Sequence, residues 1–457
     1  MNDWTIVTRS LKARLFSTLT TIASVGVAVA LMLVLIMMRS AGREAFERGT
    51  GNVHLLVSRD ASPLVSVLNG LFYAGAPGKP LTYPEYESLK GSLPLEWAIP
   101  VQLGDSYDGA WPVVATTPEF FTKFEPAEKT AWKCEQGRWF EKNFEVVLGA
   151  QAARGARLKV GDRVSMTHGA AGSRGAGSVH VHKEYKYTVV GVLAPTGTNH
   201  DRVFFTNLPS AWIIHAHDRI ERAAHAGEGA HDDHAHEDHD DHSHDDHAHD
   251  DHEKLVTEAD LIPEDRKITN VFMRVLTRPG ADVGALIPVV MEQMRRDPQF
   301  VAAPLTVAGP SAEIRKLMVI VGNVDQILFA MAVVVMVSSG VGILLALYNS
   351  MEQRRRQIAV LRVLGASQGR IFGLILTESA LIGLLGALAG VGVALAGAQV
   401  AAGVMRERLG LFIDPALPAP GLVGVAIGTL VLACAAGVVP GVMAYRTSVA
   451  KSLRPMA

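Results

Sequence analysis

Four stretches of this chain contain no charged residue for long enough to cross a lipid bilayer, which takes roughly 20 apolar residues. They run from Leu15 to Met38, Gln326 to Met351, Ser379 to Met405 and Pro415 to Tyr445. The first is longer than the apolar core of a signal peptide, so we expect a retained anchor rather than a cleaved leader. The pattern therefore predicts four transmembrane helices.

Basic residues beside these stretches predict how they are oriented. Lys and Arg cluster before the first stretch, between the second and third, and after the fourth. Short segments of this kind stay in the cytoplasm. We therefore predict a cytoplasmic N-terminus at 1–14, a cytoplasmic segment at 351–370 and a cytoplasmic tail at 446–457. The segment 39–318 then lies outside the cytoplasm, which in a bacterium means that it is periplasmic or extracellular. We expect a bacterial inner-membrane protein with this segment in the periplasm.

Those assignments fix the remaining boundaries. Transmembrane helices are predicted at 15–38, 371–405 and 421–445, the stalk together with transmembrane helix 2 at 319–350, and a short periplasmic loop at 406–420. A helical pattern from Pro310 runs into the second span and predicts a stalk that is continuous with it.

The periplasmic segment has the pattern of a folded domain. Aromatic and β-branched residues from Glu184 to Leu193 predict a strand, and apolar residues at helical spacing from Ala281 to Arg296 predict a helix despite Pro288. Further short strands are predicted at 203–205, 271–275 and 305–307. The fold class is therefore a membrane α-helical protein with four transmembrane helices and a large α+β periplasmic domain inserted between helices 1 and 2.

Hydrophobic periodicity disappears between His215 and Lys254. Within this stretch, the 23 residues from His231 to Glu253 include nine His and eleven Asp or Glu. Such a segment cannot bury enough apolar area to offset the entropy lost on ordering. We predict a disordered insertion at 215–254.

Imidazole and carboxylate groups at this density are ligands for transition metals. We expect the insertion to bind zinc, or another transition metal, as a flexible chelator without one fixed geometry. The alternative is an acidic, pH-responsive spacer. The candidate ligands are His231, His234, His236, His239, His242, His244, His247, His249 and His252.

Two other histidines, His180 and His182, alternate in a predicted strand and would share one face. They form either a second metal site or part of a solvated strand face.

Composition excludes other classes. The net charge of −2 and the lack of a basic patch indicate no nucleic-acid partner. Cys134 and Cys434 are too far apart in the predicted topology for a disulfide framework or a zinc knuckle. No combination of nucleophile and base stands out, so we do not expect an enzyme.

After the second span, Ile358, Leu361 and Leu364 recur at helical spacing and predict a short amphipathic helix that stops at Gly365. It either docks a soluble partner in a groove or lies at the membrane interface.

Several segments resemble the MacB, FtsX and LolC/LolE type of ABC transporter permease. They are QRRRQIAVLRVLGAS at 353–367, LTESALIGLLGALAG at 376–390 and PGVMAYRTSVAKSLRP at 440–455. The segment GRWFEKNFEVVLGAQAARGARLKVGDRV at 137–164 is similar to the periplasmic domain of that family. The resemblance implies a mechanical transporter, in which ATP-driven dimerisation of cytoplasmic ATPases moves the helices and the periplasmic domains respond.

The chain itself has no G-x-x-x-x-G-K-[ST] segment to cradle phosphates, so ATP is expected in a separate ATPase subunit. The resemblance places the docking element for this ATPase at Arg354, Arg355, Arg356, Ile358, Leu361, Arg362 and Gly365.

An ionisable group inside a span is costly and faces protein or water. Glu378 either couples helix motion or joins a proton or ion path, or it has a structural role, and we favour the structural role. Gly383, Gly386 and Gly390, together with Gly392, provide small residues for close helix packing. We expect a dimer with a second permease copy or paralogue through these faces.

The predicted function is a permease subunit that couples ATP hydrolysis by its partner to motion of the periplasmic domain, in the service of zinc handling and with a periplasmic or envelope partner protein. Two alternatives remain: an FtsX-like regulatory subunit that controls an envelope enzyme, or a lipoprotein or small-molecule exporter with an incidental His-rich loop.

Overall fold

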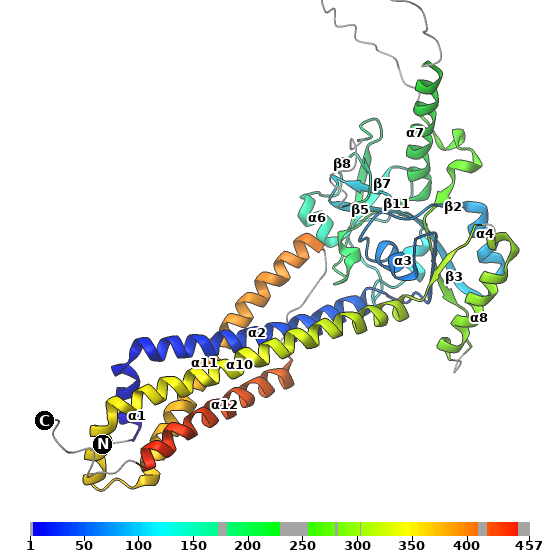
Figure 1. Cartoon of the computed structure of the whole chain (residues 1–457). Coiled ribbons are helices and arrows are strands. Elements are labelled where there is room, and N and C mark those ends of the chain that lie inside the picture. The colour runs from blue at the N-terminus through cyan, green and yellow to red at the C-terminus, as the bar shows by residue number, and fades with distance from the viewer. Residues whose placement is uncertain are drawn as a thin grey trace, which may run out of the picture. The chain divides into compact units, whose positions relative to one another are not determined.

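A computed structural model describes residues 3–171, 181–228, 255–278, 282–301, 303–409 and 418–446 (Figure 1). The chain divides into two compact units. One, here called the membrane unit, comprises Met1–Ala45 and Met318–Ala457. The other, here called the ectodomain, comprises Phe46–Leu317.

In the described part of the membrane unit the structure has five helices: α1 (Asp3–Ala13), α2 (Leu15–Arg48), α10 (Pro310–Val363), α11 (Gln368–Leu409) and α12 (Ala419–Arg446). The last four are long and apolar enough to cross a membrane, which confirms the four predicted spans. Helix α1 was not predicted, because its window is too short and too polar to show a span.

The helices extend beyond the predicted spans. Helix α2 continues to Arg48 and α11 to Leu409, because a hydropathy window marks the apolar stretch and not the end of the helix. Helix α10 has 54 residues without a break. The amphipathic helix predicted as a separate element is therefore the last part of α10, and the predicted stalk is its first part.

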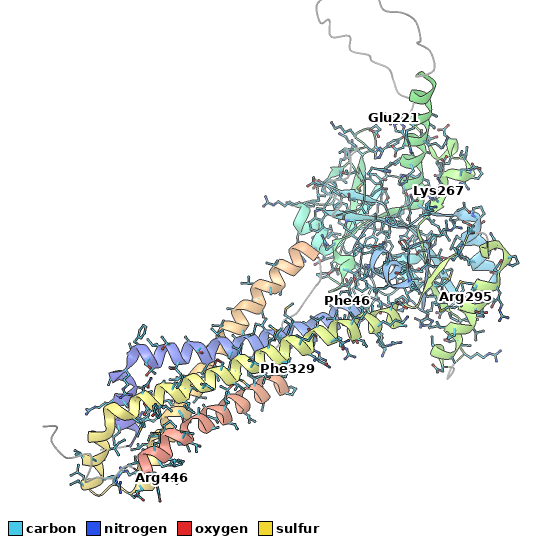
Figure 2. All side chains as sticks on the ribbon, in the orientation of Figure 1. Phe46, Glu221, Lys267, Arg295, Phe329 and Arg446 are labelled. Carbon is cyan, nitrogen blue, oxygen red and sulfur yellow. The ribbon has the colours of Figure 1, made fainter. Side chains whose placement is uncertain are left out.

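The core of the membrane unit lies where α2 meets α10, α11 and α12. Val29 and Leu33 of α2 are buried in one cluster with Ile382 of α11 and Ala433 of α12. Apolar side chains on the outer faces remain exposed, such as Phe329 on α10 (Figure 2). Exposed apolar faces of this kind suit contact with lipid.

Fourteen strands form two sheets among the ectodomain residues that the structure describes. They are β1 (Leu55–Ser58), β2 (Leu81–Thr82), β3 (Leu95–Gln102), β4 (Asp105–Tyr107), β5 (Trp111–Thr116), β6 (Cys134–Gly137), β7 (Glu145–Leu148), β8 (Arg163–Val164), β9 (Thr167–His168), β10 (Tyr187–Leu193), β11 (Phe204–Asn207), β12 (Lys267–Ile268), β13 (Asn270–Val275) and β14 (Thr306–Ala308). The large sheet has the order β14-β1-β13-β3-β5-β11-β7-β10-β6, with β4, β8 and β9 attached beside it, and β12 pairs with β2.

Most neighbours in the large sheet are antiparallel, while β11 pairs with β5 and β10 with β7 in parallel. Successive side chains of β13 point to opposite faces of the sheet, as in any strand. Val271, Met273 and Val275 pack into one apolar cluster, whereas Phe272 points to the other face, where its ring centroid lies 6.0 Å from that of Phe120. Both faces of the strand are therefore buried.

Seven helices accompany these strands: α3 (Pro63–Gly70), α4 (Tyr83–Ser92), α5 (Glu119–Lys123), α6 (Ala150–Ala156), α7 (Leu208–Glu228), α8 (Val283–Arg296) and α9 (Pro298–Val301). Tyr86 of α4, Trp212 of α7 and Met294 of α8 all join the cluster formed by β1 and β13. Glu221 marks α7 and Arg295 marks α8 in Figure 2. The α+β domain between the first two spans is thus confirmed.

Helix α7 corrects the predicted limits of the insertion. It continues to Glu228, so an unstructured segment that starts at residue 215 is wrong for 215–228. The early turns are ordered because Ile213 and Ala216 are buried in the ectodomain core. The nine candidate histidines from His231 to His252 lie outside the described residues.

Candidate functional site

The cytoplasmic end of α10 stops at a glycine, as predicted. Gly365 has a φ of +94°, which favours glycine over residues with a Cβ. The amide of Ala366 donates to the carbonyl of Leu361 at 2.9 Å, and the amide of Gly365 donates to that of Arg362 at 3.1 Å. This pair of bonds is a Schellman motif, which ends a helix and reverses the chain.

The side chains of the predicted docking element face in different directions. Ile358 is only 6% exposed and packs with Met351, Ile371 and Ile375 inside the membrane unit. Leu364, which belongs to the predicted amphipathic helix but not to the docking element, is by contrast 78% exposed.

The other described side chains of this segment also differ in their exposure to solvent. Leu361 lines a cavity of about 620 Å³, and Arg362 is half-buried. Val360 and Val363 are exposed beside Leu364. The side chains of Arg354, Arg355 and Arg356 lie outside the described residues. Ile358 is therefore a core residue, and the accessible apolar face consists of Val360, Val363 and Leu364.

Glu378 is buried in the same part of the membrane unit and contacts the unpredicted helix α1. Its Oε1 accepts a hydrogen bond of 2.9 Å from the hydroxyl of Ser10. Arg14, which follows α1, donates to the carbonyl of Ser350 on α10 at 2.9 Å. These contacts join the N-terminal residues to both α10 and α11.

The predicted glycines bring helices together within one chain. A Cβ placed on Gly386 would lie 2.5 Å from Cγ1 of Val25, and one on Gly390 would lie 2.6 Å from Cβ of Val29, both on α2. Gly383 meets Ala433 of α12 in the same way. Helices α2 and α12 of the same chain therefore occupy the positions that face Gly383, Gly386 and Gly390, whereas a Cβ on Gly392 would meet nothing within 4 Å. A dimer through these faces stays a prediction.

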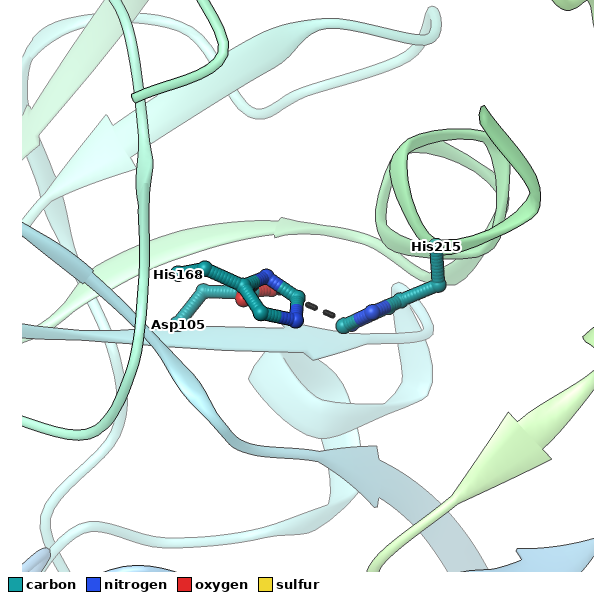
Figure 3. Close-up of side chains that lie close together, drawn as sticks. All are labelled: Asp105, His168 and His215. Atoms are coloured by element: carbon teal, nitrogen blue, oxygen red, sulfur yellow. Dashed lines mark ion pairs between the residues drawn. The ribbon is translucent and has the colours of Figure 1, made fainter. Parts of the chain in front are cut away.

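A cluster of histidine and aspartate side chains lies in the ectodomain where strands β4 and β9 meet helix α7. Strand β9 pairs antiparallel with β4, and this register places His168 directly opposite Asp105. Helix α7 adds His215 to the same group (Figure 3). Nδ1 of His168 lies 3.1 Å from Oδ1 of Asp105, and Nε2 of His215 lies 3.4 Å from Oδ2 of the same carboxylate.

A second group shares His168. Nε2 of His168 lies 3.6 Å from Oδ2 of Asp218, and Nε2 of His182 lies 3.7 Å from Oδ1. Nδ1 of His182 is 3.0 Å from Oε1 of Glu184. His182 is buried, so its prediction as part of a solvated strand face is wrong, and His180 lies outside the described residues.

The electrostatics of the cluster follow from its burial and its mixed charges. Burial alone would raise the pKa of Asp105, but His215 and His168 outweigh it and hold the pKa below its ordinary value. The adjacent Asp105 carboxylate raises the pKa of His168 in spite of burial. Burial lowers the pKa of His182, although Asp218 and Glu184 oppose this effect.

Sequence reasoning flagged only His182 of this cluster. Asp105 and His168 meet through strands of three and two residues, which are too short to show a period. One signal was present at His215, which falls on the apolar stripe of Leu208, Ala211 and Trp212 at the spacing i, i+3, i+4, i+7. A histidine at that place on the stripe is a candidate for a buried role.

Comparisons with known proteins bear on both units. The family described as MacB-like periplasmic core domain matches residues 15–286, and the one described as FtsX-like permease C-terminal matches residues 329–449. Among solved structures, the chain is similar to the extracellular domain of the noncanonic ABC-type transporter YknZ from Gram-positive bacteria. That likeness covers 48% of this chain and 92% of the other, with 8% identity and a TM-score of 0.22. No curated protein matches the chain.

Proposed function

Because this chain belongs to the MacB/FtsX family of multi-pass inner-membrane ABC transporter permeases, we propose that it transmits the effect of ATP hydrolysis by a separate cytoplasmic ATPase to its periplasmic ectodomain. It works as a dimer with a second permease copy or a paralogue, and its ectodomain acts on a periplasmic or envelope partner. The chain itself carries no phosphate-binding loop of the P-loop type.

Helix α10 is the observation that carries this proposal. It starts at Pro310, immediately after Gly309 and strand β14 of the ectodomain, and continues without a break to Val363. A hydrogen-bonded helix transmits displacement along its axis, because bending it sharply requires a break in its ladder of hydrogen bonds. Movement applied at the cytoplasmic end therefore reaches the ectodomain.

The ATPase docks on the exposed apolar face at the end of α10, formed by Val360, Val363 and Leu364. An apolar face on a helix fits a groove on a soluble partner, and the basic residues of the preceding turn add electrostatic steering. Ile358 and Leu361 support this face from the inside and do not touch the partner.

Replacing Leu364 tests the docking face. The tagged full-length chain is extracted from its native membranes in mild detergent, and ATP hydrolysis by the purified complex is measured. We expect Leu364→Asp to remove the co-purified activity, because desolvating a carboxylate in an apolar groove is unfavourable and weakens binding of the ATPase. The matched control Leu364→Met keeps the apolar surface and the activity. Equal ATP hydrolysis by both variants would place the docking face elsewhere.

The permease serves the handling of a transition metal, with zinc as the ion. The nine histidines between His231 and His252 support this proposal, because such a tract chelates zinc with modest affinity and releases it again. A spacer would need no histidine at that density.

The test is a strain in which these nine histidines are replaced by Asn, which keeps the length and the acidic residues of the insertion. We expect altered zinc content and poorer growth under a zinc chelator than in the parent strain. Unchanged zinc content and growth would remove the metal role and leave the permease assignment intact.

A further inference from the structure

We propose that Asp105, His168 and His215 form a binding site for one transition-metal dication of the zinc type in the folded ectodomain. The site is distinct from the His-rich insertion. It rests on the geometry of the described residues and goes beyond the proposed function, because it stands whichever cargo the permease serves.

The three side chains converge from three separate segments, close enough for one ion to reach all of them. Ligand atoms bound about 2.0 to 2.1 Å from a tetrahedral ion lie about 3.3 Å from one another. Nδ1 of His168 lies 3.1 Å from Oδ1 of Asp105, and Nε2 of His215 lies 3.4 Å from Oδ2 of the same carboxylate. One ligand atom from each of the three residues lies within 4.8 Å of the other two. The ring centroids of the two histidines are 4.8 Å apart. Small rotations of the side chains would bring all three onto one ion.

Buried atoms without a hydrogen bond point into this site. Asp105 is 8% exposed. Within the part of the chain that the structure describes, its Oδ1 and the Nε2 of His215 are buried and make no hydrogen bond, although both lie at ion-pair distance from a neighbour. A buried polar atom in this state costs free energy. A bound cation would satisfy both lone pairs at once.

The surroundings orient the shared histidine. Asp218 follows His215 by three residues on α7, and its Oδ2 lies 3.6 Å from Nε2 of His168. When Nδ1 of His168 faces the ion, its Nε2–H faces the Asp218 carboxylate, which is the arrangement that fixes ligand histidines in metal sites. The two carboxylates of Asp105 and Asp218 also balance the charge of a dication.

The alternative group of His168, His182 and Asp218 is weaker as a centre. It would use Nε2 of His168, and a neutral imidazole binds one ion through one nitrogen. His182 lies beside the first group, with its Nδ1 3.0 Å from Oε1 of Glu184.

Two imidazoles and one carboxylate suit zinc, cobalt or nickel better than calcium or magnesium, which prefer oxygen ligands alone. Three protein ligands leave a coordination position open. The side chains of His168 and His215 are 40% and 28% exposed, and His215 also lines a cavity of about 530 Å³. An ion can therefore enter and leave.

The position of the site connects it to the insertion. Helix α7 carries His215 and Asp218 and ends at Glu228, shortly before His231. Ions gathered by the insertion would reach an ordered acceptor at the base of the same helix. This last step rests on the proposed metal role of the insertion, whereas the site itself does not.

The experiment uses the full-length chain in detergent with the nine histidines of the insertion replaced by Asn, so that the loop imidazoles do not contribute. Zn²⁺ and Co²⁺ are the probes. We expect one ion per chain after desalting, and a visible absorption band from Co²⁺ bound to imidazole. In this background, His168→Gln or His215→Gln weakens zinc affinity about 10-fold or more, and Asp218→Asn weakens it about 10-fold through the orientation of His168.

His217→Gln is the matched control, because it changes a histidine two residues away on the same helix that packs against Tyr185 outside the cluster. It should leave zinc affinity unchanged. His168 and His215 are partly exposed, so their variants should keep the tryptophan fluorescence and thermal midpoint of the parent. The inference is overturned if the chain without loop histidines binds no ion, or if His168→Gln and His215→Gln bind as tightly as His217→Gln. Either result leaves the zinc content of the cell as an independent test of the proposed function.

Discussion

The hydroxyl of Ser10 on α1 donates a hydrogen bond of 2.9 Å to Oε1 of Glu378 on α11. This bond gives a buried acidic group a partner from a helix at the other end of the sequence, so it supports a structural role for Glu378 over an ion path.

Substitution at Glu378 separates these roles. Glu378→Gln keeps an oxygen that accepts from Ser10, and we expect it to retain the thermal midpoint in detergent and the zinc phenotype of the parent. Glu378→Leu removes the acceptor and should cost on the order of 1 kcal/mol, with a lower midpoint. Ser10→Ala should lower the free energy of unfolding by a similar amount. The double variant should lose less than the sum of the two single losses, because both substitutions remove the same hydrogen bond. Loss of function in Glu378→Gln at unchanged stability would instead indicate an ion path.

The contact between α11 and α2 leaves no room for a side chain at Gly390. Gly390→Ala would place a Cβ 2.6 Å from that of Val29, so the helices must separate, at a cost of about 1 to 3 kcal/mol. Gly392→Ala is the control, because a Cβ there meets nothing within 4 Å, and the gain in helix propensity is up to about 1 kcal/mol. We expect opposite shifts of the thermal midpoint, and equal shifts would contradict this packing.

Because His200 is buried, we expect the ectodomain to lose folding stability in weak acid. Burial lowers the pKa of His200 to about 3, while in the unfolded chain it stays near 6.5. The unfolded state therefore binds the proton first. Stability is complete above about pH 6.5 and falls as the pH drops towards 3, by on the order of 2 kcal/mol at pH 5.

The variant His200→Gln tests this prediction, since an amide can keep a hydrogen bond to the hydroxyl of Tyr73, which lies 2.7 Å from Nδ1 of His200. Its thermal midpoint, followed by tryptophan fluorescence, should change less than that of the parent between pH 7.5 and pH 5. The same acid sensitivity in both proteins would show that other groups are responsible.

Glu145 should cause a second loss of folding stability at a lower pH. Its carboxylate accepts from the guanidinium of Arg138 and from the amides of Glu141 and Lys142, and Arg138 lowers the pKa of Glu145 to about 2. The stability from this group is present above about pH 4.5 and is lost as the pH falls towards 2.

We expect Glu145→Gln to lower the thermal midpoint at pH 7 by an amount equivalent to about 1 to 2 kcal/mol, reduced from the full shift because Arg138 is half exposed. The difference should shrink at pH 3. Glu141→Gln, which changes an exposed carboxylate 4.0 Å from Arg138, should have little effect at either pH. A loss in Glu145→Gln that does not depend on pH would contradict this assignment.

The sequence was sufficient for the membrane topology and for much of the ectodomain. Long apolar runs and basic flanks are local signals, so the four spans and the strand β10 could be predicted directly. Helix boundaries could not, because Arg48 continues α2 as a polar extension that hydropathy does not detect. Helix α7 (Leu208–Glu228) was not predicted, since the polar histidines from His215 onward interrupt a stripe that the fold nevertheless buries.

The histidine cluster could not be predicted because its members meet only in three dimensions. Asp105 and His168 become neighbours through one antiparallel register, and His215 arrives on a helix whose existence at that point was not foreseen. The high density of histidines in the insertion predicts a flexible chelator from sequence alone. A preformed site, in contrast, needs residues that are distant in the sequence and are held together by tertiary structure. A local pattern contains no information about such contacts.

The unbroken helix α10 yields the last prediction. Ile320→Pro removes an amide donor within the helix and clashes with the preceding turn, which kinks it at a cost of about 3 kcal/mol or more. Ile320→Ala is the control, because Ile320 is exposed and alanine favours the helix. A dye on Ala223→Cys of α7, with Cys134 and Cys434 replaced by Ser, reports on the ectodomain in the complex with the ATPase. We expect the proline variant to hydrolyse ATP but to lose the ATP-dependent change in dye fluorescence that the alanine variant keeps. A full fluorescence response in Ile320→Pro would show that the signal reaches the ectodomain without an intact α10.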